Sequence, residues 1–193
     1  MKEIIDNILL DSLKIKQEFI FQNTSNLISL AEKLSRVFTR NGKLLICGNG
    51  GSAADAQHLA AEFVNRFILE RPPLPALALT TDTSIITSIG NDYSFDDIFT
   101  KQVKAFGMED DVLLAISTSG NSRNILNAVK VARLQGIYTV GLIGGDGGAL
   151  KSIVDLSLIV KSPLTPRIQE AHILAGHIIC HLVDHILFQK HLK

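Results

Sequence analysis

The segment from residue 43 to residue 62 constrains the fold of this chain more than any other. It opens with the apolar run 43–47, passes through the glycine turn Gly48–Ser52, and continues with alanines and apolar residues at helical spacing. This order is typical of a strand, a tight turn and the first turns of a helix. Free backbone N–H groups at such a helix start favour an anion, and the Ser52 hydroxyl adds a donor. The turn alone is equally consistent with a backbone that simply needs glycine.

The rest of the chain alternates between strand-like and helix-like segments. Strands that alternate with helices indicate a parallel sheet that helices cover on both faces. Residues 1 to about 40 read as two amphipathic helices separated by the polar stretch 23–26, and they either pack on their own domain or make oligomer contacts. The last helix is expected to run from about residue 167 to near the C-terminus. Further strands are expected at 74–79, 111–116, 138–143 and 156–160, and further helices at 83–89, 96–106, 123–135 and 149–152.

Composition favours a single globular domain that does not bind nucleic acid. Hydrophobic residues make up 46% of the 193-residue chain, and 19 basic side chains balance 19 acidic ones, so a polyanionic partner is not expected. Cys47 and Cys180 lack zinc-finger or redox spacing, and both read as buried thiols in a reducing compartment. The start of the chain does not resemble a signal peptide, and polar residues interrupt the most apolar region, 173–187. We therefore expect a cytoplasmic protein without a membrane segment.

A second loop rich in small donors follows the expected strand at 111–116. Its sequence is Ser-Thr-Ser-Gly-Asn-Ser, and we call it the phosphate loop, Ser117–Ser122. Ligands of an open parallel sheet bind beyond the carboxyl ends of the strands, where hydroxyls and backbone N–H groups can hold a phosphate. The loop lacks the lysine of a P-loop, and the glycine turn does not match the dinucleotide fingerprint. The alternative is a hydroxyl-rich helix cap.

One pair of side chains on the first α/β helix could carry chemistry. His58 and Glu62 are four residues apart and therefore share one face of the helix. Such a pair can ligate a metal, supply a base or make only a surface contact.

The last helix is rich in histidine. Three of its histidines, His177, His181 and His185, are spaced by four and could bind a metal or lie as polar groups at a buried interface. Gln169 lies eight residues before His177, which is about 12 Å of helix rise. A site using both would need nearly full extension of each side chain or a contribution from a neighbouring subunit. The same stretch also contains His172 and His191.

Together these motifs resemble those of the phosphoheptose isomerases of the sugar-isomerase (SIS) superfamily. The resemblance implies a single SIS domain over 1–193, with a helical arm at 1–41 and an α/β core at 42–193. The core would contain a five-stranded parallel sheet between helical layers, as in flavodoxin. Homotetramers with active sites between subunits are also implied. The segments that carry the resemblance are 47–52, Asp55, His58, Glu62, 90–92, 116–122 and 167–172.

The family converts sedoheptulose 7-phosphate into D-glycero-D-manno-heptose 7-phosphate, which leads to ADP-heptose and bacterial surface polysaccharide. The resemblance implies that Glu62 moves a proton between C1 and C2 through an enediol and that His177 is the partner acid or base. Several members hold zinc, for which the matching residues are His58, Glu62, Gln169 and His177. The implied substrate contacts are Asn49, Gly50, Gly51, Ser52, Asp92, Ser117, Thr118, Ser119, Ser122 and Gln169.

Two observations bear on this resemblance. Pro166 stands where some members carry an aspartate, which puts one substrate or catalytic contact in question. A similar SIS protein binds the bacterial replication initiator as a non-catalytic assembly factor, and its pattern includes a segment like Arg71–Pro75. Glu62 and His177 are both intact here, which favours the isomerase over that factor and over a SIS sugar-phosphate sensor.

Overall fold

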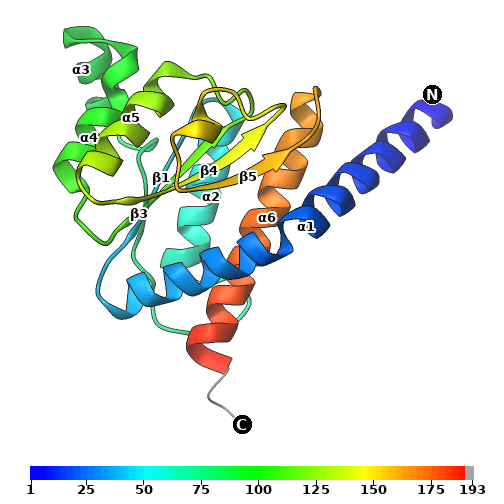
Figure 1. The fold of residues 1–193 in the computed structure, drawn as a ribbon, viewed down its shortest axis with the longest axis horizontal. Coiled ribbons are helices and arrows are strands. Elements are labelled where there is room, and N and C mark those ends of the chain that lie inside the picture. Colours follow the sequence, from blue (N-terminus) through cyan, green and yellow to red (C-terminus); the bar gives the residue numbers. More distant parts are fainter. Residues whose placement is uncertain (190–193) are drawn as a thin grey trace.

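The computed structural model describes residues 1–189 of the chain (Figure 1). His191 and the end of the α/β core predicted at 42–193 therefore lie outside the described residues. The helices are α1 (Lys2–Thr39), α2 (Gly51–Val64), α3 (Thr83–Asp92), α4 (Ile98–Phe106), α5 (Arg123–Leu134) and α6 (Thr165–Asp184), with short 3-10 turns η1 (Phe95–Asp97) and η2 (Leu150–Ser152) and a π-helical turn η3 (His185–Gln189). The strands are β1 (Leu44–Gly48), β2 (Ala76–Ala78), β3 (Val112–Ser117), β4 (Tyr138–Gly144) and β5 (Leu156–Val160).

The five strands form one parallel sheet in the order β2-β1-β3-β4-β5. This is the flavodoxin-like order, and it confirms the predicted fold. From β1 the chain first adds β2 on one side and then crosses to add β3 on the other side, so the strand order changes direction between β1 and β3. β1 and β3 pair with Gly48 opposite Ile116. The glycine turn and the phosphate loop follow these two strands directly. They therefore lie side by side at the carboxyl edge, where α/β proteins bind ligands.

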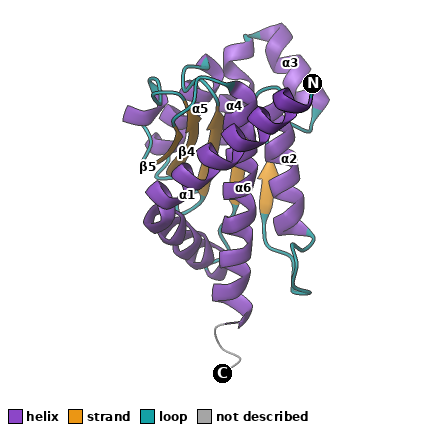
Figure 2. Ribbon diagram, turned by 90° about the vertical axis from the view of Figure 1, so that its right-hand side faces the viewer, coloured by secondary structure: helices purple, strands orange, loops and turns teal. Residues whose placement is uncertain are grey.

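Each face of the sheet has its own apolar core because successive side chains of a strand point to opposite faces. Leu44 and Ile46 of β1 pack with α1, α2 and α6, whereas Leu45 and Cys47 pack with α3, α4 and α5. Figures 1 and 2 show these two helical layers on either side of the sheet. The three-layer arrangement follows from near-continuous apolar strands that are buried on both faces.

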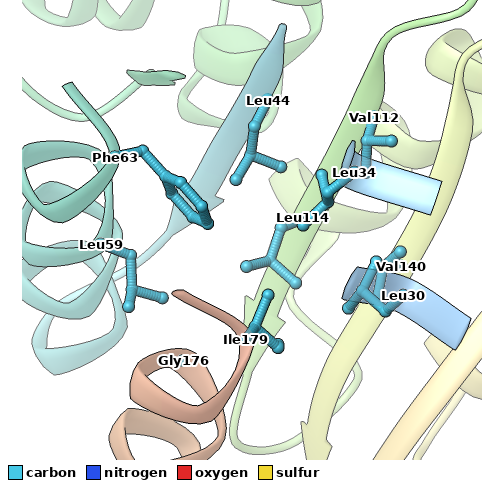
Figure 3. A pocket seen from close by; sticks show the side chains of 10 residues that line it. All are labelled: Leu30, Leu34, Leu44, Leu59, Phe63, Val112, Leu114, Val140, Gly176 and Ile179. Carbon is cyan, nitrogen blue, oxygen red and sulfur yellow. The ribbon is translucent and has the colours of Figure 1, made fainter. Parts of the chain in front are cut away.

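α2 and α6 approach each other closely at Gly176. A Cβ at this position would overlap the Leu59 side chain, so the glycine is what allows the contact. The core between these helices, α1 and the sheet leaves only a cavity of about 10 Å³, lined by apolar side chains (Figure 3). This close contact places the functional residues of α2 and α6 next to each other.

The N-terminal arm is one helix, and the prediction of two helices was wrong. α1 runs without interruption through the polar stretch at 23–26. Asn23 Nδ2 donates to the carbonyl of Phe19, and Thr24 Oγ1 donates to that of Ile20, both at 2.9 Å. These side chains satisfy their polar groups on the preceding turn, so they need not end the helix.

Two further boundaries differ from the prediction. α3 continues past Gly90 to Asp92, and Gly90 does not adopt the positive φ of a C-terminal glycine cap. The strand expected at 74–79 is only Ala76–Ala78, at the edge of the sheet. Pro75 has no backbone N–H to donate to a neighbouring strand, so the strand begins after it.

The first turns of α1 project beyond the body of the domain, as Figure 1 shows. Arg167 of α6 donates to the carbonyl of Ile8, and Glu170 accepts a hydrogen bond from Ser12, so α6 holds α1 from about this point onward. α6 with η3 is apolar and long enough to cross a membrane, but it packs in the core of the domain, which makes this weak evidence for a membrane span. Large apolar side chains left exposed on the first half of α1 are Ile4, Ile5, Ile8, Leu9, Leu10, Leu13 and Phe21.

Candidate active site

The glycine turn starts α2 in a conformation that only glycine adopts easily. Gly50, the residue before the helix, has a φ of 55°. Gly51 has a different role, because a Cβ there would overlap the amide nitrogen of Gln169 and lie 3.0 Å from its Cδ. Gln169 therefore lies directly against the start of α2. The predicted substrate residues Gly50, Gly51 and Gln169 are brought together.

The phosphate loop is organised by its own hydroxyls. The backbone N–H of Gly120 donates to Ser117 Oγ at 3.1 Å, and that of Asn121 donates to Ser119 Oγ at 3.2 Å. A hydroxyl that accepts a hydrogen bond can still donate its own hydrogen to a phosphate oxygen. Ser122 precedes α5 but makes no side-chain cap, which contradicts the alternative of a simple capping loop for this residue.

A glycine-rich segment after β4 packs against the phosphate loop and hydrogen-bonds to it. The N–H of Leu150 donates to the carbonyl of Gly120 at 2.9 Å, and the N–H of Ala149 donates to Asn121 Oδ1 at 3.0 Å. Gly147 and Gly148 both have positive φ, and a Cβ on Gly148 would lie 2.6 Å from the carbonyl oxygen of Ser119. The close contact between the two loops therefore requires glycine.

The glycine turn is also joined to the first turn of α5, which directly follows the phosphate loop. Asn49 and Asn124 exchange two side-chain hydrogen bonds, each 2.9 Å long. Asn124 is buried at the start of α5, and nothing in the sequence around it indicates this contact. The carboxyl ends of β1 and β3 thus form a single connected surface.

A second cluster lies further along α2, where His58 stands between Glu62 and His177. Its Nε2 is 2.9 Å from Nε2 of His177 and 3.4 Å from Oε1 of Glu62. The His177 ring lies between His58 and Phe67, at centroid distances of 5.1 and 5.3 Å. All of these residues belong to one chain, so no neighbouring subunit is needed to bring His58 and His177 together.

The end of α2 that carries Glu62 is fixed by a buried arginine. Arg71 donates to the carbonyls of Glu62 and Phe63 at 2.9 and 2.6 Å, and its Nε donates to Asp184 Oδ1 at 2.9 Å. Both side chains of this ion pair are almost fully buried. The pair ties α2 to α6 beside the cluster. The sequence does not reveal this role of Arg71, because Asp184 lies 113 residues away.

Asp55 is a further carboxylate on the face of α2 that carries His58. Desolvation raises its pKa, and the nearby His58 acts in the opposite direction. Its Oδ2 is buried and has no hydrogen-bond partner among the described residues. A buried carboxylate oxygen without a partner, one turn before His58, makes Asp55 a candidate member of the site.

Not all of the predicted residues meet. Asp92 lies exposed at the end of α3, where Asn91 donates to it, and α3 packs mainly on η1 and α4. Gln169 lies at Gly51 and not at His58. His181 packs on Phe67, and His185 contacts Gln189, so the histidine stripe does not form one site. Within residues 1–189, no group of three or more His, Cys, Asp or Glu side chains is arranged to hold a metal ion.

Comparison with known proteins adds a family to this geometry. Residues 10–144 match the model of the SIS domain. A phosphoheptose isomerase of Nitratidesulfovibrio vulgaris (strain Miyazaki F) is 52% identical over 93% of this chain and 86% of its own. One of Clostridium acetobutylicum is 51% identical over 97% of both chains. This chain belongs to the phosphoheptose isomerase family of SIS-domain proteins.

The fold of this chain agrees with that of a solved member of the family over nearly its whole length. The solved phosphoheptose isomerase of Neisseria gonorrhoeae superposes with a TM-score of 0.89 at 45% identity, covering 95% of this chain and 98% of its own. The match extends beyond the segment that the SIS model covers, and so includes α6 with His177. The resemblance predicted from the motifs is confirmed.

Proposed function

We propose that this protein is an aldose–ketose isomerase that converts sedoheptulose 7-phosphate into D-glycero-D-manno-heptose 7-phosphate. The observation that carries the proposal is the combination, in one chain, of a phosphate loop at the carboxyl edge with the Glu62, His58 and His177 cluster one to three turns along α2. Relatives at about 50% identity carry the name of this activity. They favour the enzyme over the non-catalytic assembly factor.

The reaction moves one hydrogen from C1 to C2 and a second from the oxygen on C1 to the oxygen on C2. The Glu62 carboxylate takes the proton from C1 of the open-chain ketose and returns it to C2, through an enediol. His177 gives a proton to the oxygen on C2 and accepts the one from the oxygen on C1, so that the carbonyl moves from C2 to C1. A carboxylate and an imidazole are suited to these two transfers. Arg71 holds the α2 backbone at Glu62, and the tilted ring contact with Phe67 holds His177.

The substrate is expected to lie along the N-terminal half of α2. Its phosphate binds the hydroxyls and N–H groups of the phosphate loop, aided by the dipole of α5. Its hydroxyls meet the glycine turn and Gln169. From Gly51 to His58 the helix rises about 10 Å. A seven-carbon sugar whose phosphate is held by the phosphate loop therefore reaches the cluster of His58, Glu62 and His177. Asp92 is proposed to contact a sugar hydroxyl only because it matches the family motif. The proposed contacts are Asn49, Gly50, Gly51, Ser52, Asp92, Ser117, Thr118, Ser119, Ser122 and Gln169.

Zinc is a proposed cofactor of this site. The donor types fit, because zinc takes imidazole nitrogens and carboxylate oxygens in proteins, and His58 Nε2 lies 2.9 Å from His177 Nε2 and 3.4 Å from Glu62 Oε1, although the described residues do not already arrange the three around one point. His58, Glu62 and His177 would hold it, and Gln169, which lies at Gly51 in this structure, is the fourth group proposed from the family. A bound zinc would stabilise negative charge on the enediol oxygens.

Zinc content measured by mass spectrometry tests this without any assay of activity. We expect zinc in the wild-type protein and its loss in His58→Ala and His177→Ala. His181→Ala, one turn further along α6 and exposed, is the matched control. Zinc retained in His58→Ala would contradict the assignment of the ligands.

The proposed assembly is a homotetramer with active sites at subunit interfaces, in the cytoplasm of a bacterium that builds heptose into a surface polysaccharide. The exposed apolar side chains of α1 support an oligomer, since a contiguous apolar helix face is normally covered. Analytical ultracentrifugation of Leu9→Lys tests this. We expect dissociation, whereas Leu134→Lys on the distant α5, also highly exposed, should leave the mass unchanged.

Turnover is the direct test of the proposed function. The purified protein is incubated with sedoheptulose 7-phosphate, with and without zinc, and the aldose product is followed by NMR. We expect product from the wild type and none from Glu62→Gln, which keeps the size of the side chain but cannot take a proton. Absence of turnover by the wild type under both conditions would reject the enzyme and leave the assembly factor as the alternative.

A further inference from the structure

Asn124 links the two loops that bind substrate in the proposed function. It lies in the first turn of α5, is 2% exposed, and is separated by 75 residues from Asn49 in the glycine turn. Asn49 Nδ2 donates to Asn124 Oδ1, and Asn124 Nδ2 donates to Asn49 Oδ1, both at 2.9 Å. Each amide thus uses one N–H and its oxygen on the other.

A backbone group determines which way round this pair lies. The N–H of Ile125 donates to Asn124 Oδ1 at 2.9 Å, and a backbone N–H can only donate. Asn124 must therefore present its oxygen to Ile125, and its amide cannot be rotated by 180°. Asn49 is fixed in turn, because rotating it alone would bring two oxygens together and two N–H groups together. One N–H of Asn49 remains free of this pair.

We propose that Asn124 is a positioning residue, which acts through Asn49 by holding the free N–H of that amide ready for an oxygen of the sugar. The inference rests on the proposed function, in which Asn49 contacts the substrate. Asn124 itself is buried and makes no contact with the sugar. The pair also couples the two loops, so the sugar is oriented relative to its own phosphate.

Asn124→Asp tests the pair with almost no change of shape. The carboxylate still accepts from Ile125 and Asn49, but it cannot donate to Asn49 Oδ1, so the Asn49 amide loses its orientation. We expect kcat/KM for sedoheptulose 7-phosphate to fall about 5- to 150-fold, the range for one unsatisfied buried polar group. Asn127→Asp is the matched control on the next turn of α5, where the amide reaches only the carbonyl of Asp96 at 3.3 Å. We expect it to keep wild-type kinetics.

Inhibition by inorganic phosphate separates positioning from a structural role. If Asn124 acts through Asn49, the inhibition constant of phosphate stays unchanged in the uncharged variant Asn124→Ser while kcat/KM falls. If Asn124 only holds the start of α5, phosphate binding weakens in parallel with kcat/KM, and the inference is wrong.

A double-mutant cycle with Asn49→Ala and Asn124→Ser gives a second, independent readout. Asn124→Ser also replaces Asn124→Asp as the test variant if the aspartate variant does not fold. Residues that act as a unit are not additive, so the double variant should be no worse than Asn49→Ala. Additive losses, or wild-type kinetics in Asn124→Asp, would overturn the inference alone. A wild-type protein that neither binds nor converts the sugar would overturn the proposed function, and the inference with it.

Discussion

Gly51→Ala is expected to damage the active site without damaging the fold. A Cβ at position 51 would overlap the amide nitrogen of Gln169 and lie 3.0 Å from its Cδ, where ordinary carbon contacts begin near 3.5 Å. Gln169 is a flexible side chain and can move away. Because its position over the start of α2 would then be lost, the contact it is proposed to make with substrate or metal is lost as well.

The two effects differ in size and direction. Alanine is favoured over glycine in a helix by up to about 1 kcal/mol, which offsets the displacement of Gln169. We expect Tm to change by no more than about 2 to 4 °C, the shift for 1 kcal/mol in a domain of this size. Loss of one hydrogen bond to a polar or charged group costs about 1 to 3 kcal/mol, so kcat/KM should fall about 5- to 150-fold.

Steady-state kinetics with sedoheptulose 7-phosphate and thermal unfolding are measured on the same preparations. Gly90→Ala is the control, since a Cβ there meets nothing within 4 Å, and it should be active and stable. Gln169→Ala and the double variant complete the cycle. Wild-type kinetics in Gly51→Ala would refute the reasoning, and so would a double variant markedly slower than Gln169→Ala, because the new methyl group would then act on the substrate itself.

Three further predictions concern single residues. Burial raises the pKa of the Cys47 thiol to about 12 and also raises the pKa of the Cys180 thiol. Neither thiol should therefore react with Ellman's reagent at pH 8 until the protein is unfolded in urea. Rapid labelling of the native protein would contradict this. Burial lowers the pKa of His172 from 6.5 to about 4, so the unfolded state binds a proton that the folded state does not, and stability should fall by up to about 3 kcal/mol as pH drops from 6.5 to about 4. Urea unfolding at both pH values checks this, and His172→Leu should lose that part of the slope. Asp184→Ala leaves the buried Arg71 unpaired and should cost about 3 to 5 kcal/mol in the same urea assay, while Glu70→Ala, whose ion pair with Arg66 is exposed, should cost less than about 1 kcal/mol.

Most of the fold was predictable because its signals are local. The apolar run at 43–47 and the glycine turn specify a strand and a helix start within the segment itself, and the alternation that follows requires a parallel sheet. α1 was mispredicted because Asn23 and Thr24 bond to their own helix, which a polar stretch in the sequence does not reveal. Edge strand β2 was overestimated because its apolar residues continue past the paired segment.

The site was predictable only where its residues lie close together in the sequence or carry a family motif. His58 and Glu62 share a helix face at a spacing of four, and the phosphate loop is continuous. Asn124 escaped notice because its partner is 75 residues away, and nothing in a single asparagine indicates a buried amide pair. That Gly51 makes room for Gln169 was equally hidden, since a glycine in a turn has several possible causes.

Isomerisation in D₂O tests the central claim, that Glu62 moves a proton through an enediol, most directly. A carboxylate that holds the C1 proton exchanges part of it with solvent before the transfer to C2, so the heptose 7-phosphate formed should carry some deuterium on C2, as detected by NMR. The Glu62→Gln variant should form neither product nor exchanged ketose. Product without any deuterium on C2, or exchange that continues in Glu62→Gln, would contradict the account.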